Sequence, residues 1–247
     1  MTGTARTWGV IPARYGSTRL PGKVLCDIAG RPMIEHVWRR AMRARSLEHV
    51  LIATDDERVA AICTGFGAEV AMTSPAHISG TDRVAEATAG RGADIVVNIQ
   101  GDEPLLDPDW IDQLALGLLE NPDSVMATLA SPISDHQQVN DPGVVKVVFD
   151  ATGRALYFSR SPIPYERHDT PVTRYQHIGL YAYRTSFLTQ YTRLPPAPLE
   201  QAEGLEQLRA LHHGHRIHVI TVEGEHTAID TLHDLQQLRT RLAVQSE

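Results

Sequence analysis

The sequence predicts an α/β protein built on a mostly parallel sheet, with a β-rich insertion at about residues 132–198. Short apolar segments rich in β-branched residues alternate with stretches in which apolar residues recur every three or four positions. This alternation is typical of repeated strand–helix units. The segment IVVNI at residues 95–99 has almost no polar alternation, so we expect it to be buried on both faces of a parallel sheet.

The expected elements follow one another along the first half of the chain. Strands are predicted at residues 8–12, 50–54, 69–72, 95–100 and 124–129. Helices are predicted between them, at residues 33–45, 57–66, 82–88 and 109–120, because each of these stretches can lay one apolar face on a sheet. Asp55 and Asp56 are capping residues before the second helix, and Asp107 followed by Pro108 begins the fourth.

The second half of the chain has a different pattern. Strands are predicted at residues 144–150, 155–159 and 176–183, joined by proline-rich loops and turns. A helical period returns at residues 199–212, and a strand at 217–222 precedes a helix that begins near Thr231. We therefore expect a single domain over residues 1–247 that carries the inserted strands, in preference to two separate domains.

Composition excludes several classes of protein. The chain has 42% hydrophobic and 21% charged residues, which suits a folded core, and its two cysteines are too few for a disulfide framework or a four-cysteine zinc site. The net charge of −7 argues against a nucleic-acid partner, because such binding needs a basic face. No apolar run approaches the ~20 residues that span a bilayer, so we expect no membrane partner. The low number of cysteines favours a reducing, cytoplasmic location.

The loop after the first predicted strand has the residues of a phosphate site. Residues 12–23 read PARYGSTRLPGK, in which Gly16 and Ser17 allow main-chain N–H groups to approach phosphate oxygens. Arg14, Arg19 and Lys23 add three cations, which suits a nucleoside triphosphate. The loop matches neither the Walker A pattern nor the dinucleotide glycine pattern. The alternative is a surface loop with scattered cations.

Two carboxylates are candidate ligands for a divalent cation. Asp102 follows the buried strand at residues 95–100, at the edge of the sheet where ligands of parallel sheets bind. An aspartate at this position can also be a turn residue, but its pairing with a phosphate loop favours the metal. Asp230 follows the last strand and precedes a helix, so metal ligation and helix capping are equally consistent with the sequence.

The motifs together resemble 3-deoxy-manno-octulosonate cytidylyltransferases in order along nearly the whole chain. The similarity includes the loop at residues 12–23 and, beyond it, the motifs SGTDR at 79–83, NIQGDEP at 98–104, VKVV at 145–148, ALYFSR at 155–160, HIGLY at 177–181 and LEQLR at 205–209. One departure is that Leu232 and His233 stand where the family commonly has Pro-Glu after Asp-Thr.

The resemblance implies a nucleotide-diphospho-sugar transferase fold with a Rossmann-like sheet, in a homodimer formed through the inserted strands. It implies transfer of CMP from CTP to 3-deoxy-D-manno-octulosonate (KDO), with release of pyrophosphate. Arg14, Lys23 and Asp102 are the predicted catalytic residues. Implied ligands of the nucleotide are Arg14, Ser17, Arg19, Lys23, Ser79, Thr81 and Arg83. Asp102 and Asp230 would bind Mg²⁺, and the sugar acid would contact Gln100, Arg160, His177, Tyr181 and Gln207.

Other interpretations stay open at this stage. The acceptor could be an amino-substituted octulosonate or a sialic-type acid, and a glycosyltransferase of similar fold or a non-catalytic nucleotide sensor are further alternatives. Arg160 alone could be a surface cation lying over the aromatic residues before it. The histidines at positions 212, 213, 215 and 218 cross a helix end, a turn and a strand start, so we expect their side chains to diverge and predict no zinc site there.

Overall fold

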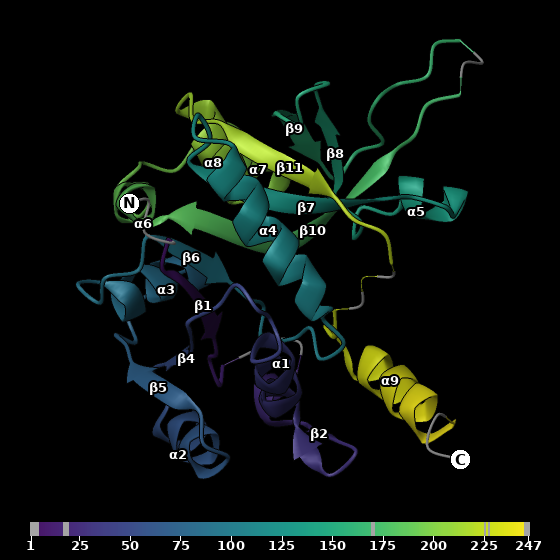
Figure 1. The fold of residues 1–247 in the computed structure, drawn as a ribbon. Coiled ribbons are helices and arrows are strands. Elements are labelled where there is room, and N and C mark those ends of the chain that lie inside the picture. The colour runs from purple at the N-terminus through teal and green to yellow at the C-terminus, as the bar shows by residue number, and fades with distance from the viewer. Residues whose placement is uncertain (1–4, 17–19, 169–170, 225, 227, 245–247) are drawn as a thin grey trace. The chain divides into compact units, whose positions relative to one another are not determined.

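The computed structural model of the chain describes residues 5–16, 20–168, 171–224, 226 and 228–244 (Figure 1). These residues form two compact units, Met1–Asp112 with His226–Glu247, and Gln113–Glu225. The point of division lies within helix α4 (Pro108–Glu120). Within the described residues, no helix is both long enough and apolar enough to cross a lipid bilayer. The single-domain organisation expected from the sequence stays a prediction.

The first unit contains a parallel sheet in the order β6-β1-β4-β5. Its strands are β6 (Ile95–Asn98), β1 (Thr7–Pro12), β4 (His49–Thr54) and β5 (Glu69–Met72), and β1 pairs parallel with β6 and β4, as β4 does with β5. The connecting helices are α1 (Met33–Ala41), α2 (Glu57–Gly65) and α3 (Gly80–Thr88). All four residues of β6 are buried. The predicted α/β class with a mostly parallel sheet is therefore confirmed.

Short elements and the C-terminal helix complete the first unit. They are the 3-10 helix η1 (Lys23–Leu25), β2 (Asp27–Ile28), β3 (Arg31–Pro32) and α9 (Leu232–Val244). Ile28 and Met33 form one buried cluster with Ile229, Leu235 and Leu238. Burial of each such side chain contributes roughly 2 kcal/mol. The cluster therefore fixes residue 229, and with it the start of the C-terminal segment, against the segment that follows β1.

The second unit is dominated by strands with mixed directions. Strand β7 (Met126–Pro132) pairs parallel with β11 (Ile217–Thr221) and antiparallel with β10 (Tyr175–Arg184). Strand β8 (Lys146–Phe149) pairs antiparallel with both β10 and β9 (Ala155–Ser159). The helices of this unit are α5 (His136–Asn140), α6 (Thr185–Tyr191), α7 (Pro198–Glu203) and α8 (Gln207–His212).

The structure differs from the sequence expectations in a few elements. The helix expected at residues 199–212 is two helices, because Gly204 adopts a left-handed backbone with φ of 63° and ends α7. Helices α5 and α6 were not predicted, since each is shorter than the windows in which a helical period is detected. Strand β7 lies two to three residues later than expected, and β6 ends two residues earlier, at Asn98.

Two glycines of the second unit with the same φ differ in what surrounds them. Gly153 and Gly214 both have φ of 79°, but a Cβ on Gly153 would lie 2.7 Å from His218 and 3.0 Å from the Val219 carbonyl oxygen, whereas nothing lies within 4 Å at Gly214. We expect Gly214→Ala to lower the free energy of unfolding by about 1 kcal/mol, because of backbone conformation alone. Gly153→Ala should cost at least about 1 kcal/mol more. Urea unfolding of both variants checks this, and equal losses would contradict it.

Candidate functional site

The carboxyl ends of β1 and β6 lie against each other in the first unit. The Ile99 amide donates to the Val10 carbonyl at 2.8 Å, which continues the pairing beyond β6. A Cβ on Gly101 would lie 3.2 Å from the Pro12 carbonyl oxygen, so the absence of a side chain lets the two strand ends approach closely. The loop after β1 and the loop after β6 therefore begin side by side.

Lys23 joins these two loops to the C-terminal segment. Its Nζ lies 2.6 Å from Asp102 Oδ2 and 3.1 Å from Asp230 Oδ1. The three side chains are partly accessible, with exposed fractions of 13% for Lys23, 25% for Asp102 and 41% for Asp230. The Ile229 amide also donates to the Asp102 carbonyl at 2.9 Å. The sequence prediction that Lys23, Asp102 and Asp230 belong to one site is consistent with this geometry.

The helix cap at the start of α9 is formed by Thr231 and Asp234, and the Asp234 carboxylate also accepts from the Asp230 amide at 2.9 Å. The Thr231 hydroxyl accepts from the Asp234 amide at 3.2 Å, and the Asp234 carboxylate accepts from the Thr231 amide at 2.8 Å. This reciprocal pair is a capping box, in which Thr231 is the N-cap. The Asp230 carboxylate is directed toward Lys23 instead. Thr231 is therefore the N-cap of α9, and metal binding by Asp230 stays a prediction.

The donor set around Lys23 suits a hard divalent cation. Asp102 and Asp230 offer carboxylate oxygens, and no third His, Cys, Asp or Glu completes a metal-ligating group with them in the part of the chain that the structure describes. Mg²⁺ is usually held by one or two carboxylates, with waters and substrate phosphates as its other ligands. Two convergent carboxylates beside a phosphate-type loop therefore fit Mg²⁺ in chemical type and number.

The loop after β1 is braced by an aromatic ring. The Arg58 guanidinium of α2 lies 3.6 Å from the centroid of the Tyr15 ring. On another side, a Cβ on Gly22 would lie 3.4 Å from this ring, and the Gly22 amide donates to the Tyr15 carbonyl at 3.0 Å. Arg14 is exposed next to this ring. The predicted ligands Ser17 and Arg19 lie outside the described residues.

The predicted cytosine-binding segment begins helix α3 beside the end of β1. A Cβ on Gly80 would lie 3.4 Å from the Pro12 side chain. Ser79 is the N-cap, since its hydroxyl accepts from the Asp82 amide at 3.1 Å. Thr81 is buried. The side chains of this segment are thus placed near the site but also hold the helix in position.

Arg83 of the same segment is occupied by partners that sequence reasoning missed. Its guanidinium donates to Thr73 Oγ1 at 2.5 Å and forms an ion pair with Asp55 at 3.2 Å. Only 4% of Arg83 is exposed. The position of Asp55 directly after β4, at the same edge of the sheet, is the one signal that could have suggested this pair.

The residues predicted to bind the sugar acid are divided between the units. Gln100 lies in the first unit, next to Asp102, while Arg160, His177, Tyr181 and Gln207 lie in the second. The His177 and Tyr181 rings of β10 have centroids 5.5 Å apart. Gln207 begins α8 and is buried, and its Nε2 has no hydrogen-bond partner among the described residues. A buried amide without a partner supports a ligand contact at this position.

Thr128 holds His177 in place, a contact that was not predicted from the sequence. Thr128 is completely buried in β7, with its Oγ1 2.9 Å from His177 Nε2. The same oxygen lies 2.9 Å from the Leu180 carbonyl, beside a register shift in β10 between Ile178 and Tyr181. The irregular strand turns the side chains of this stretch away from strict alternation. Contacts across two strands of this kind are not encoded in a local pattern.

Two of the four histidines at positions 212, 213, 215 and 218 contact each other, since the His212 and His213 ring centroids lie 5.2 Å apart in an edge-to-face arrangement. The expectation that all four side chains diverge is wrong for this pair. His213 Nε2 lies 3.1 Å from the Pro195 carbonyl, and the His215 ring lies 4.6 Å from that of Phe187. His218 lies against Gly153.

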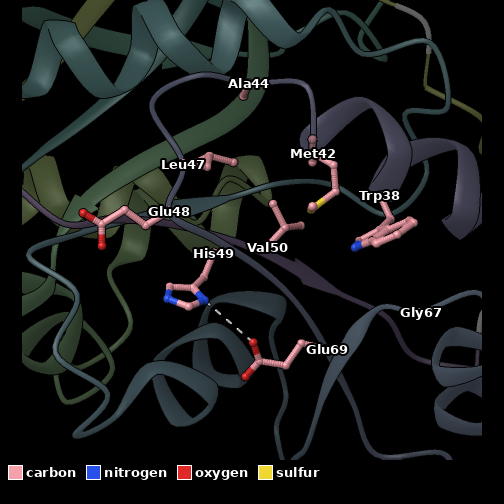
Figure 2. A pocket seen from close by; sticks show the side chains of 10 residues that line it. Trp38, Met42, Ala44, Leu47, Glu48, His49, Val50, Gly67 and Glu69 are labelled. Atoms are coloured by element: carbon pink, nitrogen blue, oxygen red, sulfur yellow. Dashed lines mark ion pairs between the residues drawn. The ribbon is translucent and has the colours of Figure 1, made fainter.

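A hollow of about 210 Å³ lies elsewhere in the first unit (Figure 2). Trp38, Met42, Leu47 and Val50 are among its lining residues, and a His49–Glu69 ion pair of 3.9 Å crosses its rim. No residue predicted for the nucleotide, metal or acceptor lines it. The hollow is therefore separate from the strand ends that carry Lys23 and Asp102.

Comparisons with known proteins show the family of this chain. Residues 8–217 match the family described as Cytidylyltransferase. A 3-deoxy-manno-octulosonate cytidylyltransferase of Solibacter usitatus is 52% identical over 93% of this chain and 92% of its own length. The chain belongs to this family of cytidylyltransferases.

Further members of the family confirm this assignment. The Pseudomonas fluorescens 3-deoxy-manno-octulosonate cytidylyltransferase is 52% identical over 94% of this chain and 96% of its own. A solved structure of a CMP:2-keto-3-deoxy-manno-octonic acid synthetase complexed with CTP is 43% identical, with a TM-score of 0.94 over 98% of this chain and 100% of that chain. The predicted nucleotide-diphospho-sugar transferase fold is confirmed by this similarity.

Beside Asp102, a buried ion pair predicts a pH dependence of stability. His226 Nε2 lies 2.9 Å from Glu103 Oε1. Burial by itself would lower the pKa of His226, but the hydrogen bond to Glu103 and the charges of Glu103 and Asp102 outweigh it and raise the pKa above 6.5. The pair should therefore stabilise the fold fully below about pH 6.5 and lose this effect as the pH rises through the raised pKa.

An NMR titration of the His226 ring measures this pKa directly. Glu103→Gln should lower it, and Glu69→Gln, which alters the exposed pair with His49, should leave it unchanged. A His226 pKa at or below 6.5 in the unaltered protein would refute the predicted direction.

Proposed function

We propose that this chain transfers CMP from CTP to KDO, giving CMP-KDO and pyrophosphate. The observation that carries the proposal is the convergence of Lys23, Asp102 and Asp230 where β1 and β6 end. In addition, the chain is about half identical to proteins named 3-deoxy-manno-octulosonate cytidylyltransferase. A cation and two carboxylates at the carboxyl edge of a parallel sheet are the groups needed to hold a triphosphate together with a divalent metal.

The proposed CTP site is formed by residues of the first unit. Arg14, Arg19 and Lys23 would neutralise the triphosphate, because each phosphate oxygen carries charge that repels an incoming nucleophile. Ser17 would donate a hydrogen bond to the phosphate oxygens. Ser79, Thr81 and Arg83 would lie near the cytosine, and the contacts of Arg83 with Thr73 and Asp55 keep that segment in place.

The proposed acceptor site uses residue types suited to a sugar acid. Arg160 would bind the carboxylate, because a planar guanidinium offers two parallel donors to its oxygens. Hydroxyl groups of the sugar would be contacted by Gln100, His177, Tyr181 and Gln207. The buried Nε2 of Gln207 and the positioning of His177 by Thr128 support these assignments.

The reaction is a direct displacement at phosphorus. The anomeric hydroxyl of KDO forms the new O–P bond at the α-phosphate, the bond to the β-phosphate breaks, and the hydroxyl proton is released. Mg²⁺ held by Asp102 and Asp230 would supply charge neutralisation at the phosphates and make the hydroxyl more acidic. Arg14 and Lys23 stabilise the departing pyrophosphate. Alignment and charge neutralisation suffice, so no covalent enzyme intermediate is formed.

The setting of the reaction follows from its substrates and from the family resemblance. We propose a cytoplasmic location, because CTP is available there, and a homodimer formed through the inserted strands.

Substrate preference is tested by pyrophosphate release. With CTP held constant, KDO should be turned over faster than an amino-substituted octulosonate or a sialic-type acid, and ATP, GTP and UTP should replace CTP poorly. We expect this preference because the sequence resembles the family in the motifs of both the nucleotide site and the acceptor site. Release with every acceptor at the same rate, or with none, would refute the proposed function. A nucleotidyl-enzyme adduct isolated after incubation with CTP alone would refute direct displacement.

Asp102→Asn tests the role of the strand-end carboxylate. We expect turnover to fall by about 100-fold or more, because the amide carries no charge to hold a divalent cation. The matched control is Asp94→Asn, which alters an exposed carboxylate at the amino end of the same strand and should keep turnover within about twofold. Steady-state pyrophosphate release measures both variants, and full turnover by Asp102→Asn would exclude its role.

A further inference from the structure

Lys146 is a fully buried ammonium group whose hydrogen bonds go to carbonyl oxygens. Its exposed fraction is 0%. Nζ donates to the carbonyls of Asp141 at 2.9 Å, Val144 at 2.7 Å and Arg160 at 2.6 Å. An ammonium group has three donors, so these contacts use all of them. A charge without a carboxylate partner in hydrogen-bond contact is costly to bury, and an apolar side chain would fill the same space with less penalty.

The three carbonyls belong to two segments, a turn that contacts Arg160 and the segment that contains Arg160. Asp141 and Val144 are in the turn before β8, and the same turn contains Pro142, whose carbonyl accepts from Arg160 Nη1 at 2.8 Å. The third carbonyl is that of Arg160 itself. Lys146 therefore fixes both the main chain of Arg160 and the turn that accepts a hydrogen bond from its guanidinium.

Glu203 at the end of α7 holds Arg160 from the other side. Its main-chain carbonyl accepts from Arg160 Nε at 2.7 Å, and its carboxylate accepts from the Arg160 amide at 2.9 Å and from the Ser159 hydroxyl at 2.7 Å. The carboxylate therefore contacts the Arg160 amide and neighbouring hydroxyl groups, while the Arg160 guanidinium bonds to the Glu203 carbonyl. Burial would raise the pKa of Glu203, but the hydrogen bonds from Arg160, Ser159 and Tyr157 and the Arg160 charge outweigh it and lower the pKa.

The result is a guanidinium that is oriented by carbonyls and makes no hydrogen bond to a carboxylate among the described residues. In the part of the chain that the structure describes, the ordered acceptors for the Arg160 guanidinium are two neutral carbonyls, on Nε and Nη1. A carboxylate in their place would neutralise the guanidinium and compete with an incoming anion. Carbonyl acceptors fix the plane of the group and leave Nη2 for a ligand.

We propose that Lys146 and Glu203 are positioning residues that hold the Arg160 guanidinium, charged and oriented, for the carboxylate of the acceptor. This inference rests on the proposed function, in which Arg160 binds that carboxylate. According to this inference, the affinity for the acid group of the substrate depends on a buried lysine and on a glutamate of another element. Neither residue touches the substrate.

The variants Lys146→Met and Glu203→Gln test this inference. Met removes the ammonium group at similar volume, and Gln removes the charge that attracts the Arg160 amide. Each should raise the KM for KDO about tenfold or more and leave the KM for CTP within about twofold, because only the acceptor carries the carboxylate in question. The preference for KDO over its carboxamide, as the ratio of kcat/KM values, should fall by a similar factor.

Two controls separate positioning from a loss of stability. Val147→Ala removes a buried side chain next to Lys146 in β8 and should lower the Tm without changing either KM. In an Arg160→Ala background, Lys146→Met should change the KM for KDO by less than about twofold, since a residue that acts through Arg160 has nothing left to position. If Lys146→Met does not fold, Glu203→Gln alone decides the outcome.

The possible results distinguish a failure of this inference from a failure of the proposed function. Equal increases in both KM values, an unchanged preference over the carboxamide, or effects of Lys146→Met and Arg160→Ala that multiply would overturn this inference while the proposed function stands. No pyrophosphate release by the unaltered protein would overturn the proposed function, and this inference with it.

Discussion

The ammonium group of Lys23, placed between two carboxylates, holds together the end of the first unit where its parallel strands stop. Asp102 and Asp230 would repel each other if no cation lay between them, and the loop after β1 supplies that cation. The bond from the Ile229 amide to the Asp102 carbonyl and the apolar cluster around Ile229 fix the same arrangement from the C-terminal side. Every function assigned to this edge requires that these three segments stay together.

The second unit uses its lysine differently. Lys23 is partly exposed and paired with carboxylates, which suits a group that exchanges partners when a polyanion arrives. Lys146 is fully buried and hydrogen-bonded to main-chain carbonyls, so it cannot exchange these partners for a substrate. These two residues are the only lysines of the chain. Under the proposed function, Lys23 would contact the charge of a substrate directly, and Lys146 would hold the backbone around an arginine that does so.

Much of the fold could be predicted from the periodicity of apolar residues, because local patterns decide which segments are strands and helices. The strands β1, β4, β5 and β9 lie within one residue of their expected bounds. The grouping of Lys23 with Asp102 was also predictable, since parallel strands place their carboxyl ends at one edge. Side-chain partners could not be predicted. Nothing in the sequence indicates that Glu203 contacts Arg160, that Thr128 contacts His177, or that His226 contacts Glu103.

The sequence by itself determined the α/β class, the order of the strands and helices, and the chemical types gathered in the loop after β1. Only the tertiary structure decided that Asp230 is directed toward Lys23 while Thr231 caps the helix, and that Arg83 is held by Asp55. The physical reason is distance along the chain. Lys23 is separated from Asp230 by 207 residues, and a contact of that span depends on how whole elements pack, which no local pattern of residues specifies.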